Sequence, residues 1–390
     1  MSDNGNNFSV ARFDPDQIDE QFIAQWRQLE SSSVQDNAFL SPSFVLPAIQ
    51  YLVDPRATHL VAVYGPDAGV LCGLGIFTYS AGSIDFPLPH FVAFKSVHSY
   101  LSGLLISKSD PEAIATALFR FLGKSSPRIF GVKFSSLDLA GQFGEVFRAL
   151  ESQQGLSWLA TDSKQRAWLD PHHGGHSWDH HVSARRRKNY RRSLKKLAEL
   201  QPVSWRLVRN GDVERSTIDN LLRLEDMGWK KSRKMSLVSQ PGQREFFTRA
   251  VENYARHNQV FFCELLLGPN VIASTCNFIS GNNGFAFKIG WDPEYWEFSP
   301  GIINEMELMK NASSQLASLE AIDSGATEDS FINSYWGNRK PLLNGAITFG
   351  TFAATMFRCM HQFRRAKRWL AEAARAFTGR NRAAPAQSDG

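Results

Sequence analysis

The strongest structural signal in this sequence is GFAFKIGWDPEYWEFSPGIINEMELMKNA, residues 284–312. Its first part, GFAFKIGW, is apolar and aromatic and predicts a strand, whereas an apolar pattern with helical spacing begins at Pro300. At the junction, Ser299 can cap the helix, Pro300 suits its first position, and Gly301 lets a ligand approach the backbone. The free amides and the dipole of such a helix start favour phosphate binding. The same residue types also begin many ordinary helices, so the signal needs support from elsewhere in the chain.

The two strand-like runs before this stretch have a counterpart near the N-terminus. VFFCELLL and VIASTCNFIS are joined by a turn at Gly268-Pro269, and THLVAVY and VLCGLGIFTY by a turn at Gly65-Pro66, 203 residues earlier. We therefore predict two copies of one α/β unit. At the place of the Ser-Pro-Gly start, the first copy has an irregular segment, residues 80–108, so the phosphate-bearing ligand is expected in the second copy.

Composition places the chain among globular proteins with room for two domains. It has 390 residues, of which 43% are hydrophobic, and no apolar run of the roughly 20 residues that cross a bilayer. The polar start MSDNGNNFSVARFD does not resemble a signal peptide, so we expect a cytoplasmic protein. Cys72, Cys263 and Cys276 lie in strand-like apolar runs, which favours reduced core thiols over disulfides or metal ligands.

The net charge of +5 is concentrated at the C-terminal end. From Arg358 onward the chain carries eight basic and two acidic side chains, so the preceding residues are close to neutral. This distribution argues against a nucleic-acid surface over the whole body. Residues 352–377 have apolar side chains on one helical face and arginines on the other. Such a helix either lies on an anionic membrane surface or packs on its own domain, which is the interpretation we favour.

A linker and a basic helix separate the two copies. DPHHGGHS, residues 170–177, contains Pro and Gly, which break regular structure, and its histidines fit no zinc-ligand spacing, so we expect no metal. Residues 182–200, VSARRRKNYRRSLKKLAEL, predict a long helix with eight basic residues and one acid. Its basic face is either simply solvated or attracts phosphates or an anionic glycan.

Several motifs, in their order and spacing, resemble those of a known family. They are FLSPSF from Phe39, HSYLSGLLI from His98, SWDHHVSARRRKNYRRSLKKL from Ser177, LEDMGWKK from Leu224, Ser299-Pro300-Gly301, and IDSGATEDSFINSYWGNRKPL from Ile322. Over residues 15–345 the chain resembles the GNAT-type acyltransferases of the CelD-like family, labelled as cellulose or exopolysaccharide biosynthesis proteins and distantly similar to the FemABX transferases.

The resemblance implies an α/β (α+β) fold of two tandem GNAT-like domains, each a mixed, mainly antiparallel sheet flanked by helices. The corresponding limits are residues 10–169 for an N-terminal domain without cofactor, 170–181 for the linker, 182–348 for the C-terminal domain, and 349–390 for a basic helix and tail. The second domain would bind acetyl-CoA or another acyl-CoA. The residues expected to contact it are Lys288, Gly290, Ser299, Pro300, Gly301, Ile302 and Asn304.

Two features of the helix start depart from typical GNAT enzymes. The longer glycine-rich loop, Q/R-x-x-G-x-G, is missing from this sequence, so Gly301 stands in its place alone. Glu305 and Glu307 also put negative charge within two turns of the expected pyrophosphate. We expect both carboxylates to point away from it.

Direct transfer from a thioester requires a group that deprotonates the acceptor and a pocket that excludes water. Glu225 is the first candidate for the general base, because its apolar neighbours and Trp229 could raise its pKa; an ordinary surface neighbour of lysines is the alternative. Asp323, at the end of a predicted strand, is the second candidate. The residues expected to bind the acceptor are Trp229, Lys230, Tyr335, Trp336 and Arg339.

The sequence therefore predicts an acyl-CoA-dependent N- or O-acyltransferase whose acceptor is polar, such as an amino sugar of a surface or exopolysaccharide. Two alternatives stay open: a Fem-like transferase that uses aminoacyl-tRNA, for which the basic helix argues, and a non-catalytic accessory protein of polysaccharide synthesis. The expected partner is a small-molecule or glycan acceptor, and nucleic acid is not expected. A membrane-bound polysaccharide synthase, reached through the C-terminal basic helix at the inner face of the membrane, is a further candidate partner.

Overall fold

The computed structural model describes residues 8–66, 69–124, 128–153, 155–172, 178–227 and 229–380. The first half contains β1 (Ser9–Phe13), α1 (Glu20–Ser32), α2 (Pro42–Tyr51), β2 (Thr58–Tyr64), β3 (Leu71–Ser80), β4 (His90–Ala93), β5 (Leu105–Ile106), α3 (Pro111–Gly123), β6 (Gly131–Leu137), α4 (Gly141–Glu151) and β7 (Leu156–Leu169). The second half contains α5 (Ala184–Leu200), β8 (Val203–Arg209), α6 (Arg215–Glu225), α7 (Trp229–Ser232), α8 (Gln243–Ala255), β9 (Val260–Leu267), β10 (Asn270–Ser280), β11 (Asn283–Trp291), α9 (Pro300–Gln315), β12 (Ala321–Asp323), β13 (Asn338–Phe349) and α10 (Thr351–Arg380).

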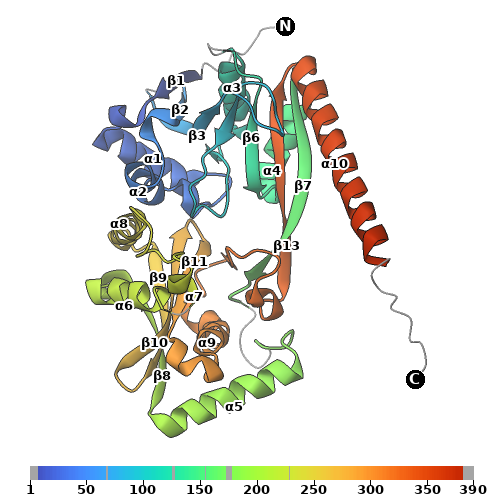
Figure 1. Cartoon of the computed structure of the whole chain (residues 1–390). Helices are drawn as coiled ribbons and strands as arrows, with labels where there is room; N and C mark the ends of the chain where they lie inside the picture. The colour runs from blue at the N-terminus through green and yellow to red at the C-terminus, as the bar shows by residue number, and fades with distance from the viewer. Residues whose placement is uncertain are drawn as a thin grey trace, which may run out of the picture.

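One mixed sheet runs through both halves of the molecule (Figure 1). Its strand order in the described chain is β1-β2-β3-β4-β6-β13-β7-β12-β11-β10-β9-β8, with β5 beside β3. Neighbouring strands are antiparallel except that β4 is parallel to β6 and β11 is parallel to β12. The run β1-β2-β3-β4-β6 is thus repeated by β8-β9-β10-β11-β12, which confirms the predicted duplication and the mainly antiparallel α/β architecture.

The two halves exchange a strand at the centre of this sheet. β13, from the end of the second half, lies between β6 and β7. β7, from the end of the first half, reaches β12, where Leu169 stands opposite Ile322. The division into domains at residues 169 and 348 stays a prediction, but the strands that end there are shared by both halves.

Hydrophobic clusters cover both faces of the sheet. Phe134 belongs to a buried cluster that includes residues of α3 and α4, and Met306 of α9 belongs to one that includes residues of α5. A further cluster joins the halves between α1, α2, α6 and α8. In it, the ring of Phe44 lies 5.2 Å from that of Phe246 and 6.0 Å from that of Phe287, measured between centroids. Because buried aromatic rings remove a large apolar area from water, this cluster stabilises the two halves as one body.

Most local signals in the sequence correspond to elements of the structure. Ser41 caps α2 by accepting a hydrogen bond from the Ser43 amide at 3.2 Å, and Pro42 occupies the first helical position. The alternating run at residues 156–169 forms one continuous strand, β7. The segment at residues 80–108, irregular in sequence, contains the short strands β4 and β5, and its loop brings His98 toward the second half.

Among the described side chains of α10, those of its first turns pack on the sheet. Ala353, Ala354 and Phe357 are buried, whereas Phe363 and Leu370 are more than half exposed. Figure 1 shows the helix following the exchanged strands β7 and β13 and then running past them. None of the helices in the described ranges is long and apolar enough to cross a membrane.

The cysteines have the environments that the sequence predicts. Cys72, Cys263 and Cys276 are free thiols buried in β3, β9 and β10. Cys359 is also free and lies exposed on α10.

Candidate functional site

β11 and β12 diverge after a short stretch of pairing. They are paired in parallel only from Asn283 to Phe285 on β11 and from Ala321 to Asp323 on β12. Beyond this point β11 continues to Trp291 beside β10, so its other edge has no strand partner among the described residues. A cavity of about 170 Å³ lies in this opening. Its walls are Tyr100, Thr275, Ala286, Phe287, Lys288, Ile289, Glu305, Ser324, Gly325, Ala326, Ser330, Phe331, Ile332 and Trp336.

Gly325 is the residue that allows the chain to leave the sheet here. Its φ is +62°, and a Cβ at this position would lie 2.5 Å from the carbonyl oxygen of Ala286. Glycine alone meets both conditions without strain. The divergence of the two strands is therefore built into the sequence after β12.

Glu305, on α9, contributes a buried carboxyl group to the cavity wall. Only 7% of the residue is exposed, and burial raises the pKa of its carboxyl group to about 8. Removal from water disfavours the charged carboxylate, and in the described chain no cation is close enough to offset that cost. A carboxyl group that titrates near neutral pH inside a cavity is suited to moving a proton.

Lys288 places a cation on the same cavity wall. Its Nζ lies 3.0 Å from His98 Nδ1 and 3.0 Å from the Tyr100 hydroxyl. Burial, together with the charge of Lys288, lowers the pKa of His98 to about 3, so this imidazole is neutral. Its Nδ1 can then accept from Lys288 while its Nε2 donates to Gln243 Oε1 at 3.1 Å. The first half of the chain thus supplies side chains that position Lys288 of the second half.

Trp336 closes the cavity with an indole ring that is almost fully buried. Its Nε1 has no hydrogen-bond partner among the described residues, although burial of a polar group normally requires one. The Tyr100 hydroxyl, by contrast, donates to the Phe287 carbonyl at 3.1 Å. Two residues that line the cavity, Trp336 and Thr275, therefore carry a buried polar atom without a hydrogen-bond partner among the described residues.

The start of α9 differs in detail from its sequence prediction. Ser299 occupies the N-cap position with φ +54° and ψ +59°, a left-handed conformation in which its side chain makes no capping bond. Its carbonyl oxygen accepts from the amides of Ile302 and Ile303 at 2.9 and 3.1 Å. Pro300 is at the first helical position, as predicted. The expected side-chain cap is therefore wrong, and two of the expected free amides already have a partner.

The two predicted ligand glycines serve close packing between elements. A Cβ at Gly301 would lie 3.2 Å from Trp291 Cδ1, and a Cβ at Gly290 would lie 2.6 Å from the backbone nitrogen of Glu225. Gly301 therefore lets α9 approach β11, and Gly290 lets the end of α6 approach the same strand. On the side where a Cβ would point, Trp291 occupies the space beside Gly301. That a ligand approaches the Gly301 amide stays a prediction.

The other polar residues of α9 divide into two groups. Asn304 is fully buried, accepts from Trp205 Nε1 at 3.0 Å and donates to the Cys263 carbonyl at 3.0 Å, so its side chain holds α9 on the sheet and is not free for a cofactor. Glu307 accepts a hydrogen bond from Tyr190, lies 3.3 Å from Lys310 and does not line the cavity. Glu305 differs from it, because it lines the cavity. That both carboxylates point away from a bound pyrophosphate stays a prediction.

The two predicted general bases lie beside the opening without lining its cavity. Glu225 is buried at the end of α6, where its Oε2 accepts from the Leu237 amide at 2.8 Å. Asp323 is buried between Lys340 at 2.9 Å and Arg166 at 3.4 Å. Burial alone would raise the pKa of Asp323, but these two cations outweigh it and hold the pKa below its ordinary value. An anion held in this way accepts a proton poorly, so Asp323 fits a structural ion pair.

Of the predicted acceptor-binding residues, Trp336 lines the cavity. Tyr335 is buried next to it and carries Arg186 over its ring at 5.7 Å. Arg339 donates to the carbonyl oxygens of Trp336 and Asn338 at 2.6 and 2.7 Å, so it orders the backbone of this loop. The side chains of Trp229 and Lys230 lie outside the described residues. In the described ranges, no group of three or more His, Cys, Asp or Glu side chains is arranged to hold a metal ion.

Sequence reasoning missed the roles of His98, Tyr100 and Glu305 at the cavity. His98 and Tyr100 lie in a motif that carries the family resemblance. They are separated from Lys288 by 190 and 188 residues of sequence, so the sequence gives no sign of their contact with it. A signal for Glu305 was present, because it is a carboxylate inside the apolar run after Pro300. A charge in such a run is costly unless it serves a function.

Comparisons with known proteins agree with this geometry. Residues 184–331 match the family model described as acetyltransferase (GNAT) domain, and the matched segment contains β11, α9 and β12. No curated protein sequence matches the chain. The resemblance to the CelD-like family in particular stays a prediction.

Several solved structures have a similar fold at low sequence identity. The structure described as FemX is 10% identical with a TM-score of 0.57, over 90% of this chain and 100% of that one. A conserved protein of unknown function from Bacteroides thetaiotaomicron VPI-5482 is 12% identical with a TM-score of 0.53, over 88% and 100%. A tandem GNAT protein from the clavulanic acid biosynthesis pathway is 11% identical with a TM-score of 0.43, over 87% and 97%. The first two likenesses concern the fold alone. The match of residues 184–331 identifies a GNAT-type acetyltransferase domain, and the chain is an acyltransferase.

Proposed function

We propose that the chain transfers an acyl group from acyl-CoA, with acetyl-CoA as the expected donor, to a nitrogen or oxygen atom of a polar acceptor. An amino sugar of a surface or exopolysaccharide is the acceptor class that fits the resemblance of the sequence. The observation that carries the proposal is the opening between β11 and β12, with its cavity of about 170 Å³. An unpaired strand edge offers backbone groups to an extended ligand, and the pantetheine arm of CoA carries amides that can pair with it.

The start of α9 supports placing the pyrophosphate of CoA at the end of this opening. The helix begins at Pro300, after β11 has ended at Trp291, and its dipole favours a negative group at that terminus. Because Ile302 and Ile303 already donate to Ser299, the Gly301 amide is the one we assign to the phosphate. This arrangement supplies fewer donors than a glycine-rich loop and predicts correspondingly weaker binding.

Glu305 replaces Glu225 and Asp323 as our proposed general base. Its carboxylate takes the proton from the acceptor while the acceptor nitrogen or oxygen bonds to the thioester carbon. The carbon–sulfur bond breaks, and the CoA thiolate leaves and takes up a proton. Lys288 and the Trp336 indole, which stand on the same cavity walls, are suited to stabilise the negative charge that develops on the thioester oxygen.

Substitution Glu305→Gln tests this assignment. It keeps the shape of the side chain and removes the proton acceptor, so kcat measured by thiol release should fall by about 100-fold or more. Titration calorimetry should give an unchanged Kd for acetyl-CoA. Glu297→Gln, on an exposed residue just before α9, is the control and should leave both values unchanged. Equal turnover by Glu305→Gln and the control would refute the role of Glu305.

An aminoacyl-tRNA donor is the second candidate, and α5 is the feature that favours it. Its exposed basic residues are Arg185, Arg186, Lys188, Arg191, Arg192, Lys195 and Lys196. Figure 1 shows this helix along the outer side of the second half, where a long polyanion can reach it. Phosphate contacts make binding strongly dependent on salt, so tRNA affinity should fall steeply between 50 and 200 mM salt if this candidate is correct. Absent or salt-independent binding of tRNA would leave acyl-CoA as the donor.

The first turns of α10 pack on the domain, as favoured from the sequence, but Phe363 and Leu370 do not. We also propose that this exposed part of α10 brings the enzyme to an anionic membrane surface, near a membrane-bound polysaccharide synthase. Phe352, Phe363 and Leu370 are each about 60% exposed or more, and their spacing places them on one side of the helix. Arg358 and Arg365 are exposed on the same helix. Apolar side chains flanked by cations are typical of helices that lie in a lipid interface. Flotation with vesicles of anionic lipid should retain the full chain, and Phe363→Asp with Leu370→Asp should abolish that retention.

A further inference from the structure

A second and larger cavity, of about 410 Å³, lies between α10 and the sheet of the first half. It shares no lining residue with the opening between β11 and β12. Its walls are Asp85, Lys133, Phe134, Ser135, Thr161, Asp162, Asn344, Gly345, Phe357, His361, Arg364 and Arg365. The volume is within the range of cavities that hold small ligands, and none of the roles described above accounts for it.

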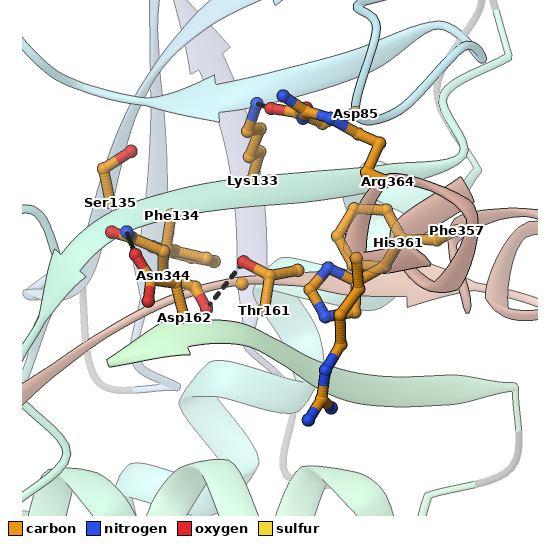
Figure 2. Close-up of a pocket in the computed structure, with 12 residues that line it drawn as sticks. Asp85, Lys133, Phe134, Ser135, Thr161, Asp162, Asn344, Phe357, His361 and Arg364 are labelled. Carbon is orange, nitrogen blue, oxygen red and sulfur yellow. Dashed lines mark hydrogen bonds and ion pairs between the residues drawn. The ribbon is translucent and has the colours of Figure 1, made fainter. Parts of the chain in front are cut away.

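One end of this cavity is rich in cations. Lys133 Nζ lies 2.9 Å from Asp85 Oδ2, and Arg364 of α10 contacts the same carboxylate. Figure 2 shows both cations reaching toward Asp85, with His361 below them on the helix. Because a single carboxylate is shared by two cations, this end of the cavity keeps an excess of positive charge. A phosphate or carboxylate of a ligand would be attracted there.

The other end carries short polar side chains that neighbour one another. Thr161 donates to the Asn344 carbonyl at 3.1 Å, and Asn344 Nδ2 lies 3.5 Å from Asp162 Oδ2. The pairing of β13 with both β6 and β7 is interrupted beside Asn344, whose Oδ1 accepts from the Ser136 amide at 2.8 Å. Ser135, Thr161, Asp162 and Asn344 lie together at this end of the cavity (Figure 2). Hydroxyl, amide and carboxylate groups in this combination can both donate to and accept from the hydroxyl groups of a sugar.

We infer that this cavity binds a sugar that carries an anionic group, a phosphate or a carboxylate. The anionic group lies at the Lys133–Arg364 end, and the sugar hydroxyls lie against Thr161, Asp162 and Asn344. Phe357, buried on α10, supplies an apolar surface for the ring. The source of the ligand is either a free sugar phosphate or uronic acid, or a charged residue within a polysaccharide. This inference does not depend on the acyl transfer proposed above.

Titration calorimetry with the full chain tests this inference. Glucose 6-phosphate and glucuronate are the probes, and glucose and inorganic phosphate are the partial ligands. We expect at least one anionic sugar to bind about tenfold or more tightly than either partial ligand, since the loss of a hydrogen bond to a charged group costs at least that factor. A uronic-acid trisaccharide distinguishes the two sources, because it binds more tightly than glucuronate only if the ligand is a polymer. Phosphate that binds as tightly as glucose 6-phosphate, together with no binding of glucuronate, would overturn the sugar assignment.

Two substitutions on α10 locate the site. Arg364→Ala removes a cation from the cavity and should weaken binding of the anionic sugar by about tenfold or more. Arg358→Ala is the matched control, because Arg358 is exposed on the same helix and does not line the cavity. Lys133→Gln, on β6, repeats the test without altering α10. Equal affinity of Arg364→Ala, Lys133→Gln and the control, or no heat from either probe at millimolar concentration, would overturn the inference.

Discussion

At the scale of single residues, Glu305 connects the candidate site to the stability of the fold. The carboxyl group is buried on α9, and its pKa of about 8 lies far above the ordinary value of 4.5. The unfolded chain releases this proton near pH 4.5, whereas the native chain keeps it until about pH 8. Between these values the unfolded state binds fewer protons, so the free energy of unfolding falls as pH rises.

The first prediction follows from this linkage. Glu305→Gln cannot ionise, so its stability relative to the unmodified chain should increase between pH 5 and pH 8. Urea midpoints of both proteins at pH 5.0, 6.5 and 8.0 measure the difference. Because every other titrating group, including Glu30, is common to both proteins, a difference that stays constant with pH would contradict the buried position of Glu305.

Gly290 gives a second prediction at this scale. A Cβ there would lie 2.6 Å from the Glu225 nitrogen and 2.8 Å from the Leu224 carbonyl carbon, which are backbone atoms that cannot turn aside. Gly290→Ala should therefore lower the free energy of unfolding by about 1–3 kcal/mol, as overpacking does in other cores. Gly211→Ala is the control, since no atom lies within 4 Å of a Cβ at that position. If Gly290→Ala lowers the free energy of unfolding no more than Gly211→Ala does, the close packing of α6 on β11 would be contradicted.

Residue roles could be predicted from the sequence only where the cause is local. Pro300 at the first position of α9 and Ser41 as the cap of α2 are determined by their immediate neighbours. The left-handed conformation of Ser299 and the burial of Glu305 depend on how α9 sits against β11. The position of His98 beside Lys288 depends on the packing of two halves that are far apart in the chain.

At the scale of elements, the opening between β11 and β12 is the feature that joins fold to chemistry. Three paired residues hold the strands together, and the φ of +62° at Gly325 turns the chain away. The sequence could predict the strand and the helix on either side of this opening, because their periodicities are strong. It could not predict the opening itself, since a strand edge without a partner leaves no mark on the pattern of apolar residues.

The starts of α3 and α9 explain why a phosphate-bearing ligand is expected only in the second half. Asp110 before α3 and Ser299 before α9 both have a left-handed backbone and both precede proline. In α3 the next residue is Glu112, whereas in α9 it is Gly301. Two acidic residues at a helix start repel a phosphate, so the ligand is expected on α9 and not on α3.

At the scale of the whole molecule, the exchanged strands make the two halves depend on each other. β13 pairs with β6 of the first half, and β7 pairs with β12 of the second. The sequence repeat predicted two copies of a unit, and that is what the sheet contains. The sequence could not predict the exchange of β7 and β13, because a strand has the same pattern of apolar residues whichever half it pairs with.

This arrangement predicts that the chain unfolds as one unit. Tryptophans lie in both halves, among them Trp26 and Trp158 in the first and Trp205 and Trp336 in the second. Urea unfolding followed by tryptophan fluorescence and by far-ultraviolet circular dichroism should give one coincident transition. Two separate transitions would mean that the halves are stable without the exchanged strands.

The proposal that acyl-CoA binds between β11 and β12 is tested most directly by titration calorimetry of acetyl-CoA against Ala326→Trp. Ala326 lines the cavity, and an indole there fills the opening without altering β11 or α9. Ala198→Trp, on the exposed side of α5, is the matched control. We predict that the unmodified chain and the control bind acetyl-CoA with the same affinity and that Ala326→Trp weakens binding by about tenfold or more. Equal affinity of Ala326→Trp and the control, or no binding to the unmodified chain, would contradict the account.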